Sequence, residues 1–312
     1  MILLISTSKS LIAWDDAGQE YHRVHHGSGV YYGISFSANR IFAAARRLPV
    51  DSSEIEMAQS SGVILVFDPE LNQVEELVPP FALRDVHQIF FDGRRLFITS
   101  PFDDMIAVWE APEWRQWRPL PPRPRRSRTS GGRHFNSLVR YADEIYLLAH
   151  NFGPSEVFVF DAETLDLRRS FAFGSHAHNL WFESGALWTC SSREHRIISD
   201  RGGVVHTGDF PRGVVATHSG DYIGVSVFSE HRQRRADYGA CIARFSPLWG
   251  PAESYRISGE GMIHEIRCPG VPDAAHPETV GPALDLTALR RRSSGICITR
   301  CALLAREPAA AL

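Results

Sequence analysis

The chain has 312 residues, of which 44% are hydrophobic, so it is long enough to bury a sizeable core. Its formal net charge of -3 creates no field that would require a nucleic acid or a membrane as partner. Lys9 is the only lysine, which excludes Schiff-base chemistry, a phosphate-binding P-loop and a lysine general base unless Lys9 itself serves.

The N-terminal residues are predicted to form strands. Residues 1–5 are hydrophobic, but the stretch is too short for a secretion signal and lacks a basic leader. Residues 3–8 and 11–14 match strands that recur later in the chain, and residues 20–24 are expected to form the outer strand of the same sheet. No stretch approaches the roughly 18 apolar residues that a membrane span needs.

Four-stranded units then follow in order. The first opens near Val30 and carries an insertion at residues 48–61, which is predicted to be a surface loop. Further units occupy residues 86–119, 134–173 and 176–209, and a fifth begins at residue 210 and carries a charged loop at 230–237. Residues 115–133 contain seven arginines. Their Pro and Gly content favours a mobile, solvated connection over a phosphate-, carboxylate- or nucleic-acid-binding segment.

A fixed internal spacing relates these units. In five units, an equivalent position lies nine residues before the start of the next strand, and these equivalent positions form one column of the repeat. The column is Tyr32, His87, Asn136, His178 and Gly213, and the following strands begin at Ile41, Leu96, Ile145, Leu187 and Tyr222. Four-stranded units that recur in this way are typical of β-propeller blades.

A sixth unit is split between the two ends of the chain. Residues 261–267 resemble the first strand of a blade, with His264 in the shared column, while residues 3–8 and 11–14 resemble the next two strands. The sequence therefore predicts an all-β, six-bladed propeller, with five or seven blades as alternatives. Its ring closes when the N-terminal strands pair with a C-terminal strand. The propeller is expected to span residues 1–270 as one domain, with 271–312 as an extension that is either partly helical, around 284–292, or disordered.

Cysteine usage favours a reducing compartment. The five cysteines form no CxxC pair and leave an odd thiol. A cytoplasmic location is therefore expected. The expected partner is a small-molecule substrate, without nucleic acid or membrane.

Three segments resemble a known family. They are residues 178–188 (HNLWFESGALW), residues 209–214 with 220–222 (DFPRGV and GDY), and residues 263–266 (IHEI). They are similar to an uncharacterised bacterial propeller family that carries a domain of unknown function, and the likeness extends over roughly residues 85–270. The resemblance implies the propeller fold and no particular activity.

The column of repeated positions predicts a metal site. Inner strands of a propeller line a central channel, so these side chains form a ring around one axis. Histidines occupy alternate blades of this ring, and three neutral imidazoles with open positions suit a catalytic divalent ion such as zinc, iron or manganese. The predicted ligands are His87, His178 and His264.

Neighbouring positions supply further candidates. Side chains two residues apart share a strand face, so Asp85, His134 and His176 are expected at the mouth of the channel. They are candidate general acids or bases, together with Tyr32 from the ring. The predicted substrate-binding residues are Asn136, Glu265 and Arg212, the last as an anion clamp at the start of its blade.

Two other interpretations of the ring remain open. Histidines on inner strands also form hydrogen bonds between blades without binding anything. Strand twist could instead turn the opposite strand face toward the axis, and its residues are Gln88, Ser137, Asn179 and Glu265.

The leading functional hypothesis is a metal-dependent enzyme that acts on a small polar or carboxylate-bearing molecule at the axis. The arrangement is similar to propeller lyases that cleave peptidyl hydroxyglycine or oligogalacturonate, and this resemblance implies a lyase, with epimerase and hydrolase as related reactions. The same three histidines would also suit an iron-dependent oxygenase or oxidase. A hypothesis of another class is a non-catalytic propeller that binds an acidic ligand or a protein through its top face and residues 115–133.

Overall fold

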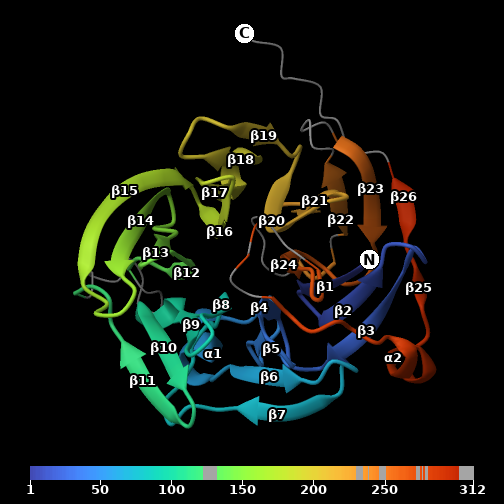
Figure 1. The fold of residues 1–312 in the computed structure, drawn as a ribbon, viewed down its shortest axis with the longest axis horizontal. Helices are drawn as coiled ribbons and strands as arrows, with labels where there is room; N and C mark the ends of the chain where they lie inside the picture. The colour runs from blue at the N-terminus through green and yellow to red at the C-terminus, as the bar shows by residue number, and fades with distance from the viewer. Residues whose placement is uncertain are drawn as a thin grey trace.

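The computed structural model describes residues 1–121, 132–229, 235–237, 239–245, 251–271, 275, 277 and 280–301. Six antiparallel sheets surround one axis, with the innermost strands β4, β8, β12, β16, β20 and β24 nearest the centre (Figure 1). The predicted six-bladed β-propeller is therefore confirmed.

The strands of each blade lie side by side from the axis outward, and the blades are numbered I to VI. Blade I contains β4 (Tyr31–Ser37), β5 (Arg40–Ala45), β6 (Val63–Phe67) and β7 (Gln73–Leu77). Blade II contains β8 (Ile89–Phe91), β9 (Leu96–Ser100), β10 (Met105–Glu110) and β11 (Glu113–Trp117). Blade III contains β12 (Phe135–Tyr141), β13 (Glu144–Ala149), β14 (Pro154–Asp161) and β15 (Leu167–Ser175).

The second half of the ring follows the same plan. Blade IV contains β16 (Ala177–Glu183), β17 (Ala186–Ser191), β18 (Arg196–Ser199) and β19 (Val204–His206). Blade V contains β20 (Phe210–Thr217), β21 (Gly220–Ser226), β22 (Ala240–Phe245) and β23 (Pro251–Ile257). Blade VI contains β24 (Ile263–Arg267), β1 (Ile2–Thr7), β2 (Ser10–Asp15) and β3 (Glu20–His26).

The ring closes as the sequence predicts. Strand β24 pairs antiparallel with β1, and Ile266 lies opposite Ile5. This pairing joins the two ends of the propeller, because the facing edges of β24 and β1 pair with each other.

Part of the C-terminal extension also adds to the propeller. Strand β25 (Ile296–Cys297) pairs with β3, and β26 (Thr299–Cys301) pairs with β23, so blades V and VI each gain a fifth strand. Helix α2 (Thr287–Arg292) lies within the predicted helical range, and all three elements lie at the outer rim (Figure 1). The domain boundary at residue 270 stays a prediction.

The insertion at residues 48–61 is more ordered than the predicted surface loop. It contains helix α1 (Glu54–Gln59), whose N-terminus is closed by a capping box between Ser53 and Glu56. Val50 and Met57 of the insertion are buried. Most of the predicted mobile connection at 115–133 and of the loop at 230–237 lies outside the described residues.

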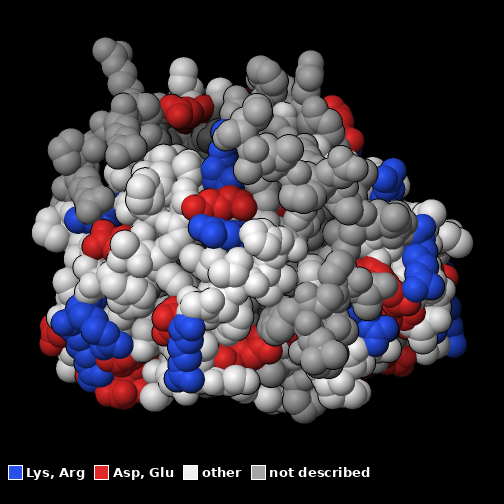
Figure 2. Space-filling view, turned by 90° about the horizontal axis from the view of Figure 1, so that it is seen from above, with Lys and Arg blue, Asp and Glu red and all other residues white. Residues whose placement is uncertain are grey.

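The core lies mainly between adjacent blades. Trp14 of blade VI, for example, packs edge-on against Tyr222 of blade V, with ring centroids 5.8 Å apart. None of the helices in the described ranges is long and apolar enough to cross a membrane. On the side of the molecule shown in Figure 2, basic and acidic side chains adjoin one another. This mixed surface is consistent with the small net charge.

Candidate axial site

A cavity of about 440 Å³ opens on the axis where the inner strands begin. The described part of its wall contains six histidines, four arginines, one carboxylate and a group of apolar and aromatic side chains. These are His87, His134, His150, His176, His178, His264, Arg46, Arg193, Arg212, Arg235, Asp85, Tyr32, Val50, Phe152, Phe210, Phe228 and Met262. Eight of the ten residues that the sequence singled out therefore line one space.

The other two predicted residues lie in a smaller cavity. Asn136 and Glu265 line a space of about 20 Å³, whose wall also includes His87, His178 and Arg212. This volume has room for about one water molecule. The side-chain oxygen Oδ1 of Asn136 is buried there without a hydrogen-bond partner. A direct substrate contact through Asn136 or Glu265 stays a prediction.

Bulges in the inner strands explain why residues from both strand faces reach the axis. The pairing register shifts at the ring column between Tyr31 and Ile34, Phe135 and Ser137, His178 and Leu180, and Arg212 and Val214. A bulge inserts one extra residue and so turns two consecutive side chains toward the same side. The two sets of residues that the sequence left as alternatives are therefore both present around the axis.

The second set, which includes Gln88, Asn179 and Glu265, forms a hydrogen-bonded ring. The carboxylate of Glu265 accepts from Gln88 Nε2 at 3.1 Å and from Asn179 Nδ2 at 3.3 Å. The side-chain oxygen of Gln88 accepts from the backbone N–H of Leu138 at 2.9 Å, and Asn179 Oδ1 accepts from the N–H of Gly213 at 3.0 Å. These bonds join the inner strands of five blades, which is a structural role.

Arg212 lies between two of the three predicted metal ligands. One terminal nitrogen donates to Nδ1 of His264 at 2.9 Å, and the other donates to Nε2 of His178. Because a guanidinium carries only donors, both ring nitrogens must be acceptors. The opposite ring nitrogens then donate, His178 Nδ1 to Ser192 Oγ at 2.9 Å and His264 Nε2 to Ser8 Oγ at 3.3 Å.

This arrangement bears directly on the predicted three-histidine centre. The ring does gather His87, His178 and His264 around one cavity. The acceptor lone pairs of His178 and His264 nevertheless face Arg212, so a metal ion held by all three histidines would have to displace the guanidinium. As they stand, His178 and His264 orient Arg212.

A different group has the composition of a metal site. Asp85, His87 and His134 each offer a ligand atom, and these atoms lie within 4.8 Å of one another, so the group could hold a metal ion. Nδ1 of His87 donates to the backbone oxygen of Asp85 at 2.6 Å. The carboxylate of Asp85 accepts from Arg46 at 3.2 Å, and Tyr32 stacks on His87 with ring centroids 4.2 Å apart.

Burial keeps four histidines of this site neutral. It lowers the pKa of His87 to about 3 and that of His178, His264 and His150 well below the usual value. The Arg212 charge is the second cause for His178 and His264. Burial also lowers the pKa of Arg212 to about 10, so its guanidinium stays charged at neutral pH.

His150 is a member of the site that the sequence reasoning missed. Its ring lies 5.0 Å from those of His176 and His178, and its Nδ1 accepts from the backbone N–H of Phe152 at 3.1 Å. The signal was in the repeat, because one column of residues lies fourteen positions after the ring column. That column is Ser8, Arg46, Pro101, His150, Ser192 and Val227, with Ser8 assigned through the split blade.

Three of the predicted acid–base residues have left-handed backbones. The φ angle is 55° at Asp85, 57° at His134 and 45° at His176. A non-glycine residue in this region costs of order 1–3 kcal/mol, and such residues cluster at functional sites. The strain shows that the surrounding structure holds these side chains at the mouth of the cavity.

Comparisons with known proteins extend to the fold alone. No family model and no curated protein matches the chain. A solved structure titled as a nidogen/laminin complex contains a similar chain, with a TM-score of 0.62 and 12% identity over 85% of this chain and 97% of that one. A protein of unknown function from Bacteroides caccae has a TM-score of 0.59 and 10% identity over the same shares of the two chains. At these identities the likeness shows a shared β-propeller and transfers no activity.

Proposed function

We propose that the axial cavity binds a small molecule through a carboxylate or similar anionic group, and that the protein is an enzyme that moves a proton on that molecule. One observation carries the proposal. Arg212 points a charged guanidinium at the cavity, and no carboxylate of the described residues forms an ion pair with it.

The physical reason is the energetics of a partly desolvated charge. Taking a guanidinium out of water is costly unless an anion pairs with it. His178 and His264 hold Arg212 in one orientation but supply no negative charge. Nε of Arg212 is buried without a partner. An anion in the cavity would therefore complete the set of hydrogen bonds and offset the charge, as planar guanidinium groups do with carboxylates.

The cavity also suits proton transfer. Its volume of about 440 Å³ falls in the range of small-molecule sites, roughly 300–1,000 Å³. Burial and the nearby charge of Arg193 lower the pKa of His176, so this histidine is neutral and can accept a proton at neutral pH. His134 and the hydroxyl of Tyr32 are the other candidates for acid–base work at the same wall.

Elimination is the reaction class that we propose first, with epimerisation and hydrolysis as related reactions. Elimination and epimerisation begin with removal of a proton beside a carboxylate, a step that a neutral imidazole can perform once a cationic group holds that carboxylate. A divalent zinc, iron or manganese ion is part of this proposal. The non-catalytic form of the proposal keeps the anion site and lacks the proton transfer.

Binding and chemistry can be tested separately. Malonate, malate and phosphate are titrated into the protein by calorimetry in EDTA, with Arg212→Met and Arg212→Lys as variants. Loss of a buried charge pair predicts that Arg212→Met weakens the best ligand about 30-fold or more. Arg201→Met, an exposed arginine that donates to the Gly185 carbonyl on the outer surface, is the matched control. Equal affinity in Arg212→Met and in the unaltered protein would contradict the proposal.

The proton transfer is followed by NMR. A panel of 2-hydroxycarboxylates is incubated in deuterated water with added zinc, manganese or ferrous iron, and exchange of the hydrogen beside the carboxylate is measured. We expect exchange with at least one compound and its loss in His176→Gln. Anion binding without exchange would leave the non-catalytic ligand-binding propeller as the function.

A further inference from the structure

The geometry points to a divalent-cation site made of Asp85, His87 and His134, on the wall of the cavity that faces Arg212, and to binding of this cation that is coupled to binding of the anion. The inference rests on the proposed function because it uses the anion at Arg212. It adds a site, different from the three-histidine centre that the sequence predicts, and narrows the class of ligand.

Hydrogen bonds distinguish the three predicted ligands from one another. In His178 and His264 the acceptor nitrogen receives a guanidinium N–H, so neither has a lone pair for a cation in the present arrangement. In His87, Nδ1 donates to the backbone oxygen of Asp85 at 2.6 Å, which leaves the lone pair on Nε2. A metal-binding histidine usually donates its other ring N–H to such an oxygen, which fixes the tautomer and the ring orientation.

The rest of the group matches what a cation needs. Asp85 adds a carboxylate and His134 a second imidazole, and the ligand atoms of the three residues lie within 4.8 Å of one another. The His87 and His134 rings are 5.0 Å apart and nearly perpendicular, at 84°. A small contraction would bring two nitrogens and one oxygen to the distances of about 2.0–2.2 Å that zinc and similar ions require.

The backbone holds two of these ligands in place at a cost in strain. Asp85 and His134 have φ angles of 55° and 57°, where glycine would be the unstrained choice. The N–H of His134 is fixed by the carboxylate of Asp104 at 2.8 Å. The contact with Asp104 therefore holds the backbone of His134 in place, and Arg46 pairs with the carboxylate of Asp85.

The position of Arg212 implies coupling between cation and anion. Asp85, His87 and His134 immediately precede the inner strands of blades II and III, whereas Arg212 belongs to blade V, across the axis (Figure 1). The charges of Arg46 and Arg212 oppose a cation in the empty cavity, and an anion on Arg212 removes part of that opposition. The ligand class that suits both Arg212 and the cation is a carboxylate that carries a second oxygen group, such as a 2-hydroxycarboxylate or a dicarboxylate.

The experiment titrates Co²⁺ into the protein with and without malonate, and follows Co²⁺ absorption and heat. We expect one equivalent of bound Co²⁺ and an apparent dissociation constant at least about 10-fold lower when malonate is present, with the reciprocal effect of Co²⁺ on malonate. The variants are His87→Gln, Asp85→Asn and His134→Asn, because Asn tolerates the left-handed backbone. Each should abolish the bound equivalent, with folding checked by circular dichroism.

His176→Asn is the matched control. His176 has the same backbone conformation, with φ 45°, and lines the same cavity, but it lies outside the proposed ligand set. It should retain the Co²⁺ equivalent. Loss of Co²⁺ in His264→Gln with retention in His134→Asn would overturn the inference in favour of the three-histidine centre, and no binding with or without malonate would overturn it outright. Malonate binding measured in EDTA reports on Arg212 alone, so failure of the cation site and failure of the anion site are distinguishable.

Discussion

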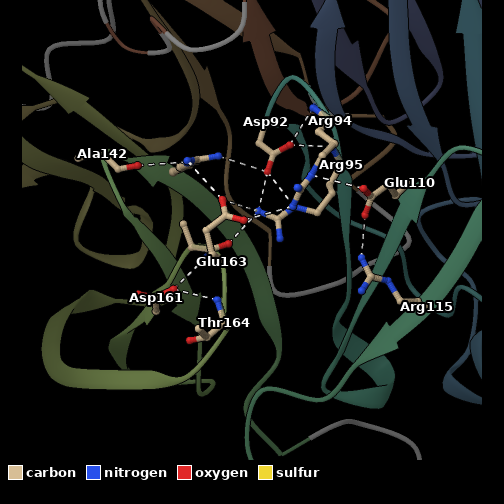
Figure 3. A network of polar contacts seen from close by, with 11 residues as sticks. Asp92, Arg94, Arg95, Glu110, Arg115, Ala142, Asp161, Glu163 and Thr164 are labelled. Carbon is tan, nitrogen blue, oxygen red and sulfur yellow. Dashed lines mark hydrogen bonds and ion pairs between the residues drawn. The ribbon is translucent and has the colours of Figure 1, made fainter.

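Arg212 of the axial cavity differs from the arginines between blades II and III. In the second region Asp92, Arg94, Arg95, Arg140 and Glu163 form a network of polar contacts, the Asp92 network (Figure 3). Arg95 is 3% exposed, and its guanidinium donates to Asp92 at 2.9 and 3.0 Å. Arg212, in contrast, donates to two neutral imidazoles and to no carboxylate of the described residues.

The difference separates arginines with a structural role from the one that we propose to bind an anion. A buried guanidinium that the chain itself neutralises joins two blades and needs nothing further. One that the chain surrounds with neutral acceptors keeps the capacity to bind an anion from outside.

The largest expected effect is on stability, and it falls on the paired arginine. Replacing Arg95 by Met leaves the buried carboxylate of Asp92 without its closest cation, so we expect a loss of about 3–5 kcal/mol in the free energy of unfolding. Replacing Arg212 by Met removes a charge that has no anion, so we expect a change within about 1 kcal/mol. Urea denaturation in the absence of ligand measures both.

The double variant Arg95→Met with Asp92→Asn tests the cause. Restoring charge balance should recover part of the loss, because the remaining partner is then uncharged. If Arg212→Met proved as destabilising as Arg95→Met, the distinction between the two regions would fail.

The next effect is a loss of stability in acid. Burial, and after it the charge of Arg212, hold the pKa of His178 and His264 well below the unfolded value of about 6.5. Below pH 6.5 the unfolded chain therefore binds protons that the folded chain does not, and stability falls as the pH falls. The expected slope approaches 1.4 kcal/mol per pH unit for each of these histidines.

Urea denaturation between pH 7.5 and 5 measures this slope. His178→Gln and His264→Gln should each reduce it, and the exposed His206→Gln should leave it unchanged. A slope that is the same in all of these variants would mean that other groups cause the acid sensitivity.

The smallest expected effect concerns strain. Glycine accepts the left-handed backbone of His176 without penalty, so His176→Gly should change stability by no more than about 1 kcal/mol and in the stabilising direction. His195→Gly, at φ 54° outside the cavity, is the matched control and should show the same gain. Only His176→Gly should also abolish exchange of the hydrogen beside the carboxylate. Equal exchange in the two variants would mean that His176 does not move the proton.

The fold was predictable because its signals are local. The nine-residue spacing from Tyr32 to Ile41 repeats in five blades, and segments at the two ends of the chain resemble the strands of the sixth. The same register brought Asp85, His87, His134, His176, His178, Arg212 and His264 to one cavity. His150 and Arg46 follow from that register as well, since they lie fourteen residues after Asn136 and Tyr32.

The sequence by itself indicated six blades, the closure of the ring and eight of the side chains that line the axial cavity, because a repeated spacing places equivalent residues at equivalent positions. Only the tertiary structure decided what those side chains do to one another. The bulges turned two neighbouring residues toward the axis at once, and Arg212 came to lie between His178 and His264. Which ring nitrogen keeps its lone pair depends on contacts between residues far apart in the chain, such as Ser8 with His264, and no spacing along a sequence records them.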